Sequence, residues 1–315
     1  MLCYVLTLAR RPRSAASRDC ERMKIAAIIP AYNSAHFLKG CIDSILGQTY
    51  PLAEIIVVDD GSRDNTREIV ESYASERVRY FWQVNGGLSA ARNTGVRETT
   101  SPWVGFLDAD DRWEPRKIEL QVKALEADPE AVFCYTGKLL AGPGDRMSVA
   151  EAFPAERLWP RMRYENNITP STVVMRRDVL EAAGGFDEKL RACEDWDLWV
   201  RLGPGCRMVA VKEPVTWFRL SEGSMSMDTD RMLTAVGRML ETSLPKGLSG
   251  PSRWAWLRRA WSAELSRCAL SARELRDRRS LSLLLRSIAA WPSPFFLSWR
   301  WKALVLHAAG IRRER

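Results

Sequence analysis

The stretch W-V-G-F-L-D-A-D-D at residues 103–111 joins a short apolar run to three closely spaced aspartates. The run Trp103–Leu107 holds only apolar residues and one glycine, as expected of a strand that is buried on both faces of a parallel sheet. Downstream, Pro115 lies where the first turn of a helix is expected. The stretch therefore predicts a buried strand, an acidic loop at its carboxyl end, and a helix that covers the sheet.

The same succession of strand, polar loop and helix occurs three times upstream. The predicted strands cover residues 24–29, 54–58 and 78–83. The predicted helices run from a cap at Ser34 to Gly47, from a cap at Asp64 to Tyr73, and over Leu88–Glu98. Strand and helix that alternate every ~20–25 residues predict an α/β fold with a mixed, mostly parallel sheet flanked by helices. Further strands are predicted at 171–175 and 215–220, and a helix at 193–202.

A polar loop follows each of the first four predicted strands. These loops are Pro30–Asn33, Asp59–Ser62, Asn85–Gly87 and Asp108–Asp111. The carboxyl ends of parallel strands meet at one edge of a sheet, and ligands bind at that edge. We therefore expect the four loops to form one site.

The pair Asp108 and Asp110 suits a divalent cation, because carboxylates one residue apart at a strand end point the same way. Only two histidines occur in the chain, His36 and His307, so a metal here would be bound mainly by oxygen, which favours Mn²⁺ or Mg²⁺. The alternative is an acidic turn in which Asp110 or Asp111 caps the next helix.

Two other loops offer groups for a nucleotide. A carboxylate of Asp59 or Asp60 can accept hydrogen bonds from a base or a ribose, although a plain turn would look the same. The backbone amides of the glycine loop at 85–87 suit a phosphate, and Arg92 would add positive charge. The alternative is an ordinary loop with Arg92 on a solvated helix face.

A third acidic pair, Glu194 and Asp195, begins the helix predicted at 193–202. A carboxylate in a partly dry site beside Trp196 and Trp199 can act as a general base toward a sugar hydroxyl, and the indoles could stack on the sugar. The alternative is a solvated acidic turn with both tryptophans in the core.

Taken in order, five motifs closely resemble family 2 of the glycosyltransferases, the inverting enzymes of the GT-A fold. They are I-I-P-A-Y-N at 28–33, V-V-D-D-G-S at 57–62, A-A-R-N-T-G at 90–95, F-L-D-A-D-D at 106–111 and G-G-F-D with E-D-W-D between 184 and 197. The resemblance covers about residues 23–225 and implies a catalytic domain over 23–240.

The resemblance also implies a role for each motif. Asp110 would bind the metal directly together with Asp108, and Asp195 would be the catalytic base with Glu194 beside it. The implied nucleotide-binding residues, with Asp60 toward the base and Asp108 toward the ribose, are Pro30, Ala31, Tyr32, Asn33, Asp60, Gly87, Arg92, Asp108 and Ala109.

The implied reaction is the transfer of a hexosyl group from a nucleotide-sugar, by default a UDP-sugar, to a hydroxyl of a glycan or lipid-linked acceptor in polysaccharide or glycolipid synthesis. One departure concerns Ser221, which stands where many relatives carry a histidine. Its contact would be lost or supplied by Arg219 or Glu222, which predicts a weak metal site that the donor diphosphate completes.

Two other functions fit parts of the pattern. A non-catalytic carbohydrate- or nucleotide-binding protein could keep the fold, although Asp60, Asp108, Asp110 and Asp195 are all present. A sugar-phosphate nucleotidyltransferase would carry glycines and a basic residue in its first loop, which here reads Pro30-Ala31-Tyr32-Asn33.

The ends of the chain differ from its middle. Residues 1–22 are rich in arginine and lack the apolar core of a signal peptide, so we expect a disordered leader or a start that truly lies at Met23. From residue 251 onward, fourteen Lys and Arg stand against four Asp and Glu, and six of the thirteen tryptophans lie there. We expect the tail at 245–315 to be helical.

The tail is predicted either to bind the membrane surface or to pack on the catalytic domain. It has no apolar run of ~18 residues that could span a membrane, and no motif for nucleic acid accompanies its charge. Seven scattered cysteines indicate an intracellular protein without a disulfide scaffold. We therefore expect a cytoplasmic enzyme, at the inner face of the membrane if the tail binds lipid.

Overall fold

The computed structural model describes residues 22–73, 75, 77–142, 146–220, 227–243, 248–274, 277–293, 300–302 and 304. They form two compact units. The first comprises the described residues up to Trp159, with Ile168–Lys189 and Leu202–Leu220. The second comprises Pro160–Asn167, Leu190–Arg201 and the described residues after Leu220. The domain boundary expected at 240–245 stays a prediction, and residues 1–21 of the expected leader lie outside the described residues.

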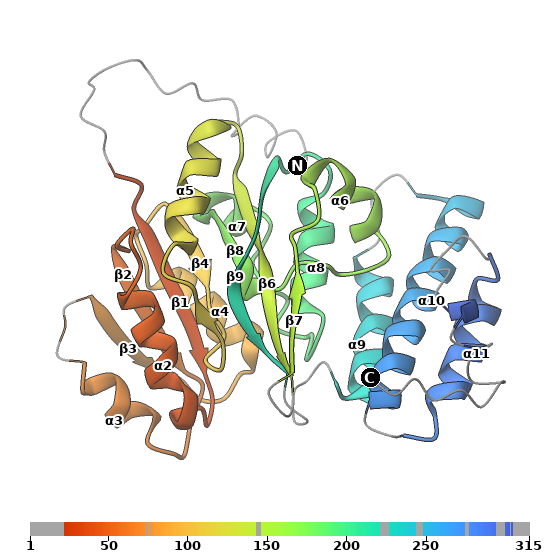
Figure 1. Ribbon diagram of the computed structural model, residues 1–315, viewed down its shortest axis with the longest axis horizontal. Helices are drawn as coiled ribbons and strands as arrows, with labels where there is room; N and C mark the ends of the chain where they lie inside the picture. The colour runs from red at the N-terminus through yellow and green to blue at the C-terminus, as the bar shows by residue number, and fades with distance from the viewer. Residues whose placement is uncertain are drawn as a thin grey trace. The chain divides into compact units, whose positions relative to one another are not determined.

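The first unit contains a sheet whose N-terminal part is parallel (Figure 1). Its strands are β1 (Ile25–Ala31), β2 (Glu54–Asp59), β3 (Val78–Trp82) and β4 (Trp103–Phe106). They lie in the order β3-β2-β1-β4, with every neighbouring pair parallel. Every residue of β1 and β4 is buried, which explains why neither strand alternates between polar and apolar residues.

The sheet continues beyond β4 with antiparallel pairings. Its further strands are β5 (Arg112–Trp113), β6 (Phe133–Gly142), β7 (Arg146–Ala150), β8 (Val173–Arg176) and β9 (Met208–Arg219). The path runs β4-β8-β6-β9-β5, with β7 paired to β6. Only β6 and β9 are parallel to each other in this part. The sheet is therefore mixed, and the predicted α/β class is confirmed.

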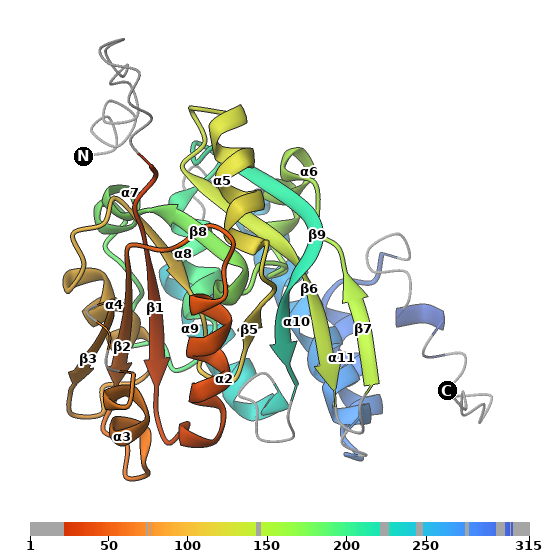
Figure 2. The same cartoon turned by 60° about the vertical axis from the view of Figure 1, so that its left-hand side comes forward.

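Helices cover both faces of this sheet (Figure 2). Those of the first unit are α2 (Ala35–Leu46), α3 (Thr66–Glu71), α4 (Leu88–Arg97), α5 (Lys117–Ala127), most of α6 (Ala155–Met162) and α7 (Arg177–Ala182), with a 3₁₀ turn, η1 (Pro170–Thr172). Leu38 of α2 and Ile118 of α5 share one core cluster with β1, whereas Ala91 of α4 packs with β2 on the opposite face. At Gly95 of α4 a Cβ atom would collide with Ile28, so glycine lets α4 lie close to β1.

The start of α2 corrects one expectation. Ser34 does not cap the helix, because its hydroxyl donates to the carbonyl of Tyr32 (3.1 Å). Instead, the Ala35 amide donates to Asp64 Oδ2 (2.9 Å), and Asp64 Oδ1 accepts from the hydroxyl of Thr66 (2.6 Å) at the start of α3. A single carboxylate from the loop after β2 thus serves the first turns of two helices.

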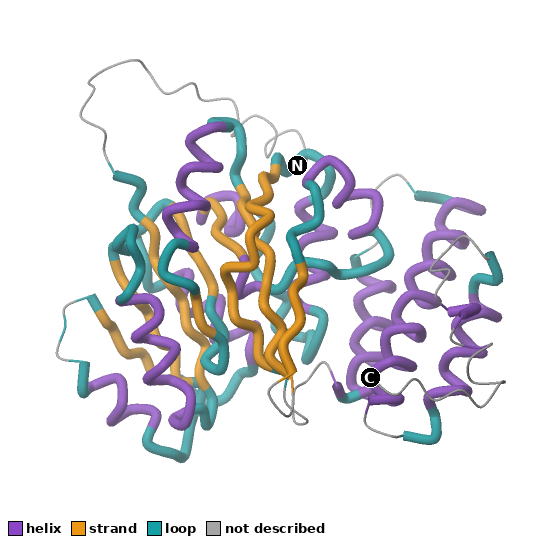
Figure 3. Tube along the Cα trace, in the orientation of Figure 1, coloured by secondary structure: helices purple, strands orange, loops and turns teal. Residues whose placement is uncertain are grey.

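The second unit is helical in its described part (Figure 3). It contains nearly all of α8 (Glu194–Leu202), then α9 (Thr229–Thr242), α10 (Gly250–Glu274) and α11 (Ser280–Ala290). Asp228 caps α9 by accepting from the Arg231 amide (3.0 Å), and α10 packs against both α9 and α11. Among the described helices, none is both long and apolar enough to cross a membrane.

Lys117 lies fully buried in the first unit, where lysine is rare. Its ammonium donates to Gln121 Oε1 (2.7 Å) and lies 4.0 Å from the centre of the Trp113 ring. Burial lowers the pKa of Lys117 to about 7 from its ordinary value of 10.5, because the charged form loses its hydration.

We predict that Lys117→Met changes how stability depends on pH. The folded pKa lies below the unfolded one, so the unfolded state binds more protons above about pH 7 and the free energy of unfolding of the wild type rises with pH. Without this titration, the stability of the variant relative to wild type should fall between about pH 7 and about pH 8.5, by at most about 1.4 kcal/mol per pH unit.

Urea unfolding at several pH values measures this difference. Lys123→Met is the matched control, since Lys123 lies on the same helix with its side chain 62% exposed. It should keep the wild-type slope. Equal slopes for Lys117→Met and wild type would show that Lys117 stays protonated in the fold.

Candidate functional site

The loops after β1, β2, β3 and β4 meet at one edge of the sheet, as predicted. Ala31 at the end of β1 pairs with Asp59 at the end of β2, and Asp59 pairs with Trp82 at the end of β3. Leu107, which follows β4, donates its amide to the carbonyl of Ile28 in β1 (3.0 Å). The strand register therefore places the four loops side by side.

Hydrogen bonds join the first two loops. The Asn33 amide donates to Ser62 Oγ (2.9 Å), and the Arg63 amide donates to Asn33 Oδ1 (2.9 Å). Asn33 has a left-handed backbone (φ 48°), which asparagine tolerates better than most residues. Tyr32, which precedes Asn33 in this loop, is 52% exposed at the sheet edge.

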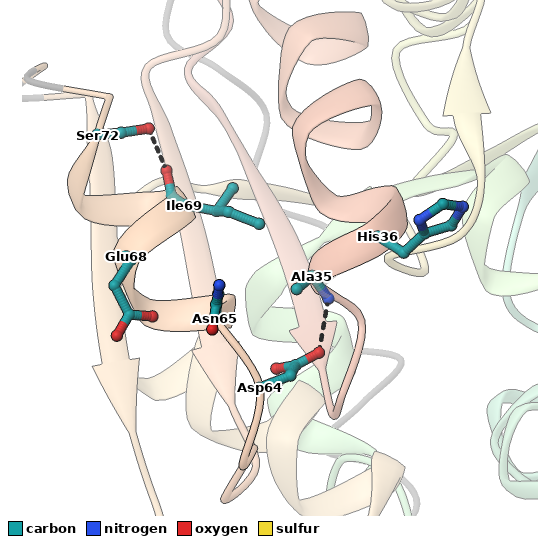
Figure 4. A pocket seen from close by; sticks show the side chains of 7 residues that line it. All are labelled: Ala35, His36, Asp64, Asn65, Glu68, Ile69 and Ser72. Carbon is teal, nitrogen blue, oxygen red and sulfur yellow. Dashed lines mark hydrogen bonds between the residues drawn. The ribbon is translucent and has the colours of Figure 1, made fainter.

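A hollow of about 630 Å³ opens at the starts of α2 and α3 (Figure 4). Its lining residues are Ala35, His36, Asp64, Asn65, Glu68, Ile69 and Ser72. The hydrogen bond from Ala35 to Asp64 crosses one side of it. None of the nucleotide or metal residues predicted from the sequence is among its lining residues, so this hollow is distinct from the predicted site.

Asp60 organises the glycine loop after β3. Its Oδ1 accepts from the Gly86 amide (2.8 Å) and from Gln83 Nε2 (2.7 Å), and its Oδ2 accepts from the Gly87 amide (2.8 Å). Asp60 is buried, and Gly87 has a positive φ of 92°, which favours glycine. The two amides that we expected to face a phosphate thus donate to Asp60, and the expected contact of Asp60 with a base stays a prediction.

Arg92 forms a buried ion pair with Asp108. The Arg92 side chain is 1% exposed, and one of its terminal nitrogens donates to Asp108 Oδ1 (2.7 Å). Its guanidinium carbon lies 5.3 Å from the centre of the Phe186 ring. The alternative of a solvated Arg92 is therefore wrong. Arg92, on helix α4, instead holds the carboxylate of Asp108. The Asp108 side chain stays 24% exposed.

Asp110 and Asp111 have different environments. Asp111 is buried, where its carboxylate accepts from Ser171 Oγ (2.5 Å) and from the Arg219 amide (2.9 Å). Burial and then the charges of Asp108 and Asp110 raise the pKa of Asp111. Burial and then the charge of Asp108 also raise the pKa of Asp110, to about 6. Helix α5 starts after Arg116 without a side-chain cap, so the alternative of a capping aspartate is wrong.

The donor set of this loop fits a hard divalent cation. Asp108 and Asp110 supply carboxylate oxygens, which Mg²⁺ and Mn²⁺ prefer, and a cation would relieve their mutual repulsion. Within the described residues, no group of three or more His, Cys, Asp and Glu is arranged to hold a metal. Two carboxylates do not complete the octahedral shell that Mg²⁺ requires, so other ligands would fill it. Ser221 and Glu222, which the sequence singled out there, lie outside the described residues.

The predicted base, Asp195, lies in the second unit at the start of α8. Its Oδ1 accepts from the Trp196 amide (2.7 Å) and its Oδ2 accepts from Asn166 Nδ2 (2.8 Å). Neighbouring Glu194 is 6% exposed. Trp196 and Trp199 are buried, so of the two alternatives for these indoles the one that places both in the core is confirmed, and stacking on a sugar is wrong.

Two residues that hold the acidic side chains were not predicted from the sequence. Ser171 Oγ accepts from the Asp108 amide (3.2 Å) and donates to Asp111, so one hydroxyl ties the acidic loop to η1. Asn166 contacts Asp195 from a loop of irregular structure. No sequence pattern marks either residue, because each acts through a contact between segments far apart in the chain.

Comparisons with known proteins agree with this geometry. The model of "Glycosyl transferase family 2" matches residues 26–182, and that of "Glycosyltransferase like family 2" matches residues 146–244. An uncharacterized glycosyltransferase of Rickettsia typhi is 34% identical over 188 residues, which are 56% of this chain and 58% of the relative. The chondroitin synthase of Pasteurella multocida is 32% identical over 185 residues, 56% of this chain and 18% of the relative. The chain thus spans well under two thirds of these relatives.

Solved structures share the fold. A mannosyltransferase of Pyrobaculum calidifontis, in complex with GDP-Man and Mn²⁺, has a TM-score of 0.58 at 21% identity and covers 98% of this chain and 94% of its own. TarS of S. aureus, in complex with UDP-GlcNAc, has a TM-score of 0.57 at 19% identity and covers 85% and 81%. With both family models and the predicted motifs in agreement, the chain belongs to glycosyltransferase family 2, with the GT-A fold.

Proposed function

We propose that this protein transfers a sugar from a nucleotide-sugar, by default a UDP-sugar, to an acceptor hydroxyl with inversion at the anomeric carbon. The observation that carries the proposal is the carboxylate pair Asp108 and Asp110 at the carboxyl edge of the parallel strands, with Asp108 held by the buried Arg92. The family supports a glycosyltransferase, and the similar structures are complexes of UDP-GlcNAc and of GDP-Man.

Asp108 and Asp110 would hold Mn²⁺ or Mg²⁺, and the Mn²⁺ in the similar mannosyltransferase supports this choice. A bound cation supplies positive charge that stabilises a nucleoside diphosphate as it leaves. Arg92 fixes the orientation of Asp108 by a 2.7 Å hydrogen bond. Asp60 holds the glycine loop, and the exposed Tyr32 ring would contact the nucleoside.

Asp195 would act as the general base. As it takes the proton of the acceptor hydroxyl, that oxygen bonds to the anomeric carbon of the donor, and the bond from that carbon to the diphosphate breaks. Asn166 and the Trp196 amide each donate to one oxygen of the Asp195 carboxylate. Both bonds limit the rotation of the base, and the buried Glu194 adds negative charge next to it.

The acceptor would be a hydroxyl of a glycan or a lipid-linked sugar, in polysaccharide or glycolipid synthesis. A chondroitin synthase among the relatives supports a glycan acceptor. We place the enzyme in the cytoplasm, since all cysteines in the described residues are free thiols, as is usual in a reducing compartment. A non-catalytic binding protein is the alternative, and it would release no nucleoside diphosphate from any donor.

Asp110→Asn should lower the rate of nucleoside diphosphate release by roughly a hundredfold or more, because the loop loses one carboxylate ligand of the cation. The assay offers a panel of UDP- and GDP-sugars with and without Mn²⁺. Asp178→Asn is the matched control, since Asp178 is exposed and paired with Arg176 in the same unit. It should keep full activity. If the wild type releases nucleoside diphosphate at the same rate after Mn²⁺ has been chelated, the metal assignment is wrong.

Asn166→Ala should lower kcat by roughly tenfold and leave the KM for the donor unchanged, because it removes a hydrogen bond to the charged form of Asp195. Losing that bond makes protonation of the base easier, so the acidic limb of the pH–rate profile should move to higher pH.

Asn167→Ala is the control for this prediction. Asn167 is the neighbouring exposed amide and donates to Glu165 Oε1 (3.2 Å) rather than to Asp195. A purely structural role for Asn166 would lower the amount of folded enzyme but leave the shape of the pH profile unchanged. An unmoved profile therefore argues against Asp195 as the base that Asn166 orients.

A further inference from the structure

An aromatic and basic patch lies where the beginning of α10 meets the end of α11. The indoles of Trp254 and Trp291 lie there with ring centres 6.3 Å apart, and Trp254 is 56% exposed. The guanidinium of Arg259 lies 4.6 Å from the centre of the Trp291 ring. Arg253, one residue before Trp254, is also exposed. We call these four residues, together with the exposed Arg286, the Trp–Arg patch.

A hollow of about 610 Å³ adjoins this patch within the second unit. Leu257, Trp261 and Leu265 of α10 form one wall, and Leu240 of α9 contributes to another. Arg286 of α11 and Arg258 of α10 also line the hollow together with one carboxylate, Glu241 of α9, so positive side chains outnumber negative ones among its lining residues. The combination offers apolar surface to a hydrocarbon and positive charge to an anion.

One neighbouring arginine has a structural task. Arg258 donates to the carbonyls of Ala290 (2.6 Å) and Ala289 (2.7 Å), which are among the last carbonyls of α11 and need a donor. It also lies 5.1 Å from the Trp254 ring centre, so it fixes the end of α11 against α10. Arg258 therefore holds the end of α11 against α10. The exposed arginines of the patch, Arg253, Arg259 and Arg286, are available to a partner.

We propose that the Trp–Arg patch binds the surface of an anionic lipid bilayer. Exposed indoles prefer the region between head groups and acyl chains, and arginine side chains are attracted to anionic head groups in the same region. A soluble acidic partner would account for the arginines but not for the exposed Trp254 indole beside a hollow that is lined largely by apolar side chains. Contact through this patch would be peripheral, because no described helix can span a membrane.

Co-sedimentation of the full-length protein with vesicles tests this proposal. Wild type should sediment with vesicles that contain phosphatidylglycerol and stay in solution with vesicles of pure phosphatidylcholine. The double variant Arg259→Gln, Arg286→Gln should bind the anionic vesicles roughly thirtyfold more weakly, given about one tenfold step per 1.4 kcal/mol and about 1 kcal/mol per arginine. Trp254→Ser should also weaken binding, without any change in charge.

The matched control is the double variant Arg273→Gln, Arg278→Gln. These arginines are also exposed and change the net charge equally, but they lie at the opposite end of α10 and beyond it. The control should bind like wild type. If both double variants lose equal affinity for anionic vesicles, binding comes from diffuse electrostatic attraction and the proposal for the patch is wrong. Absence of binding to anionic vesicles, equal binding to neutral ones, or a patch-dependent preference for duplex DNA would each overturn the proposal as well.

Thermal unfolding separates a binding defect from a folding defect. Each variant should unfold near the wild-type temperature, because the substituted side chains are exposed. If the double variant Arg259→Gln, Arg286→Gln fails to fold, the test rests on Trp254→Ser. Vesicle binding by Trp254→Ser equal to that of the wild type would then overturn the proposal. Loss of donor turnover with intact lipid binding would leave this inference standing, since it does not rest on catalysis.

Discussion

The buried ion pair between Arg92 and Asp108 is the interaction on which the candidate site depends. It crosses from α4 on one face of the sheet to the loop at the end of β4, so it ties a covering helix to the sheet edge. A guanidinium buried to this degree needs a charged partner, because breaking such a pair costs roughly 3–5 kcal/mol, somewhat less where one partner is partly exposed. The fold therefore fixes the position of one carboxylate that a ligand can reach.

Three aspartates in four residues take three different roles around this pair. Asp108 is held by Arg92, Asp111 is buried under Ser171 and the Arg219 amide, and Asp110 lies between them. Burial and then the charge of Asp108 raise the pKa of Asp110 above that of an ordinary aspartate. Negative charge is thus concentrated on the two carboxylates that we propose as metal ligands, and a cation bound there would relieve their repulsion.

Much of the first unit could be predicted from the sequence, because buried parallel strands and their polar loops leave a clear pattern. The strand ends at Ala31, Asp59 and Phe106 lie within two residues of the expected positions. The whole of β6 escaped prediction, because its buried apolar start is short and its residues from Lys138 onward are only partly buried and follow no clear alternation. Side-chain partners were harder still. The patterns contained the glycine loop and Asp60, but not the hydrogen bonds by which Asp60 occupies two amides of that loop.

Asp108 and Asp110 would form an incomplete metal site that a nucleoside diphosphate completes. Electron paramagnetic resonance of free Mn²⁺, recorded while the protein is titrated with and without UDP or GDP, measures this coupling directly. We expect weak Mn²⁺ binding to the protein alone and binding at least roughly tenfold tighter in the presence of one of these nucleotides, beyond the binding of Mn²⁺ by the nucleotide itself. An Mn²⁺ affinity that neither nucleotide changes would show that no nucleoside diphosphate completes the site.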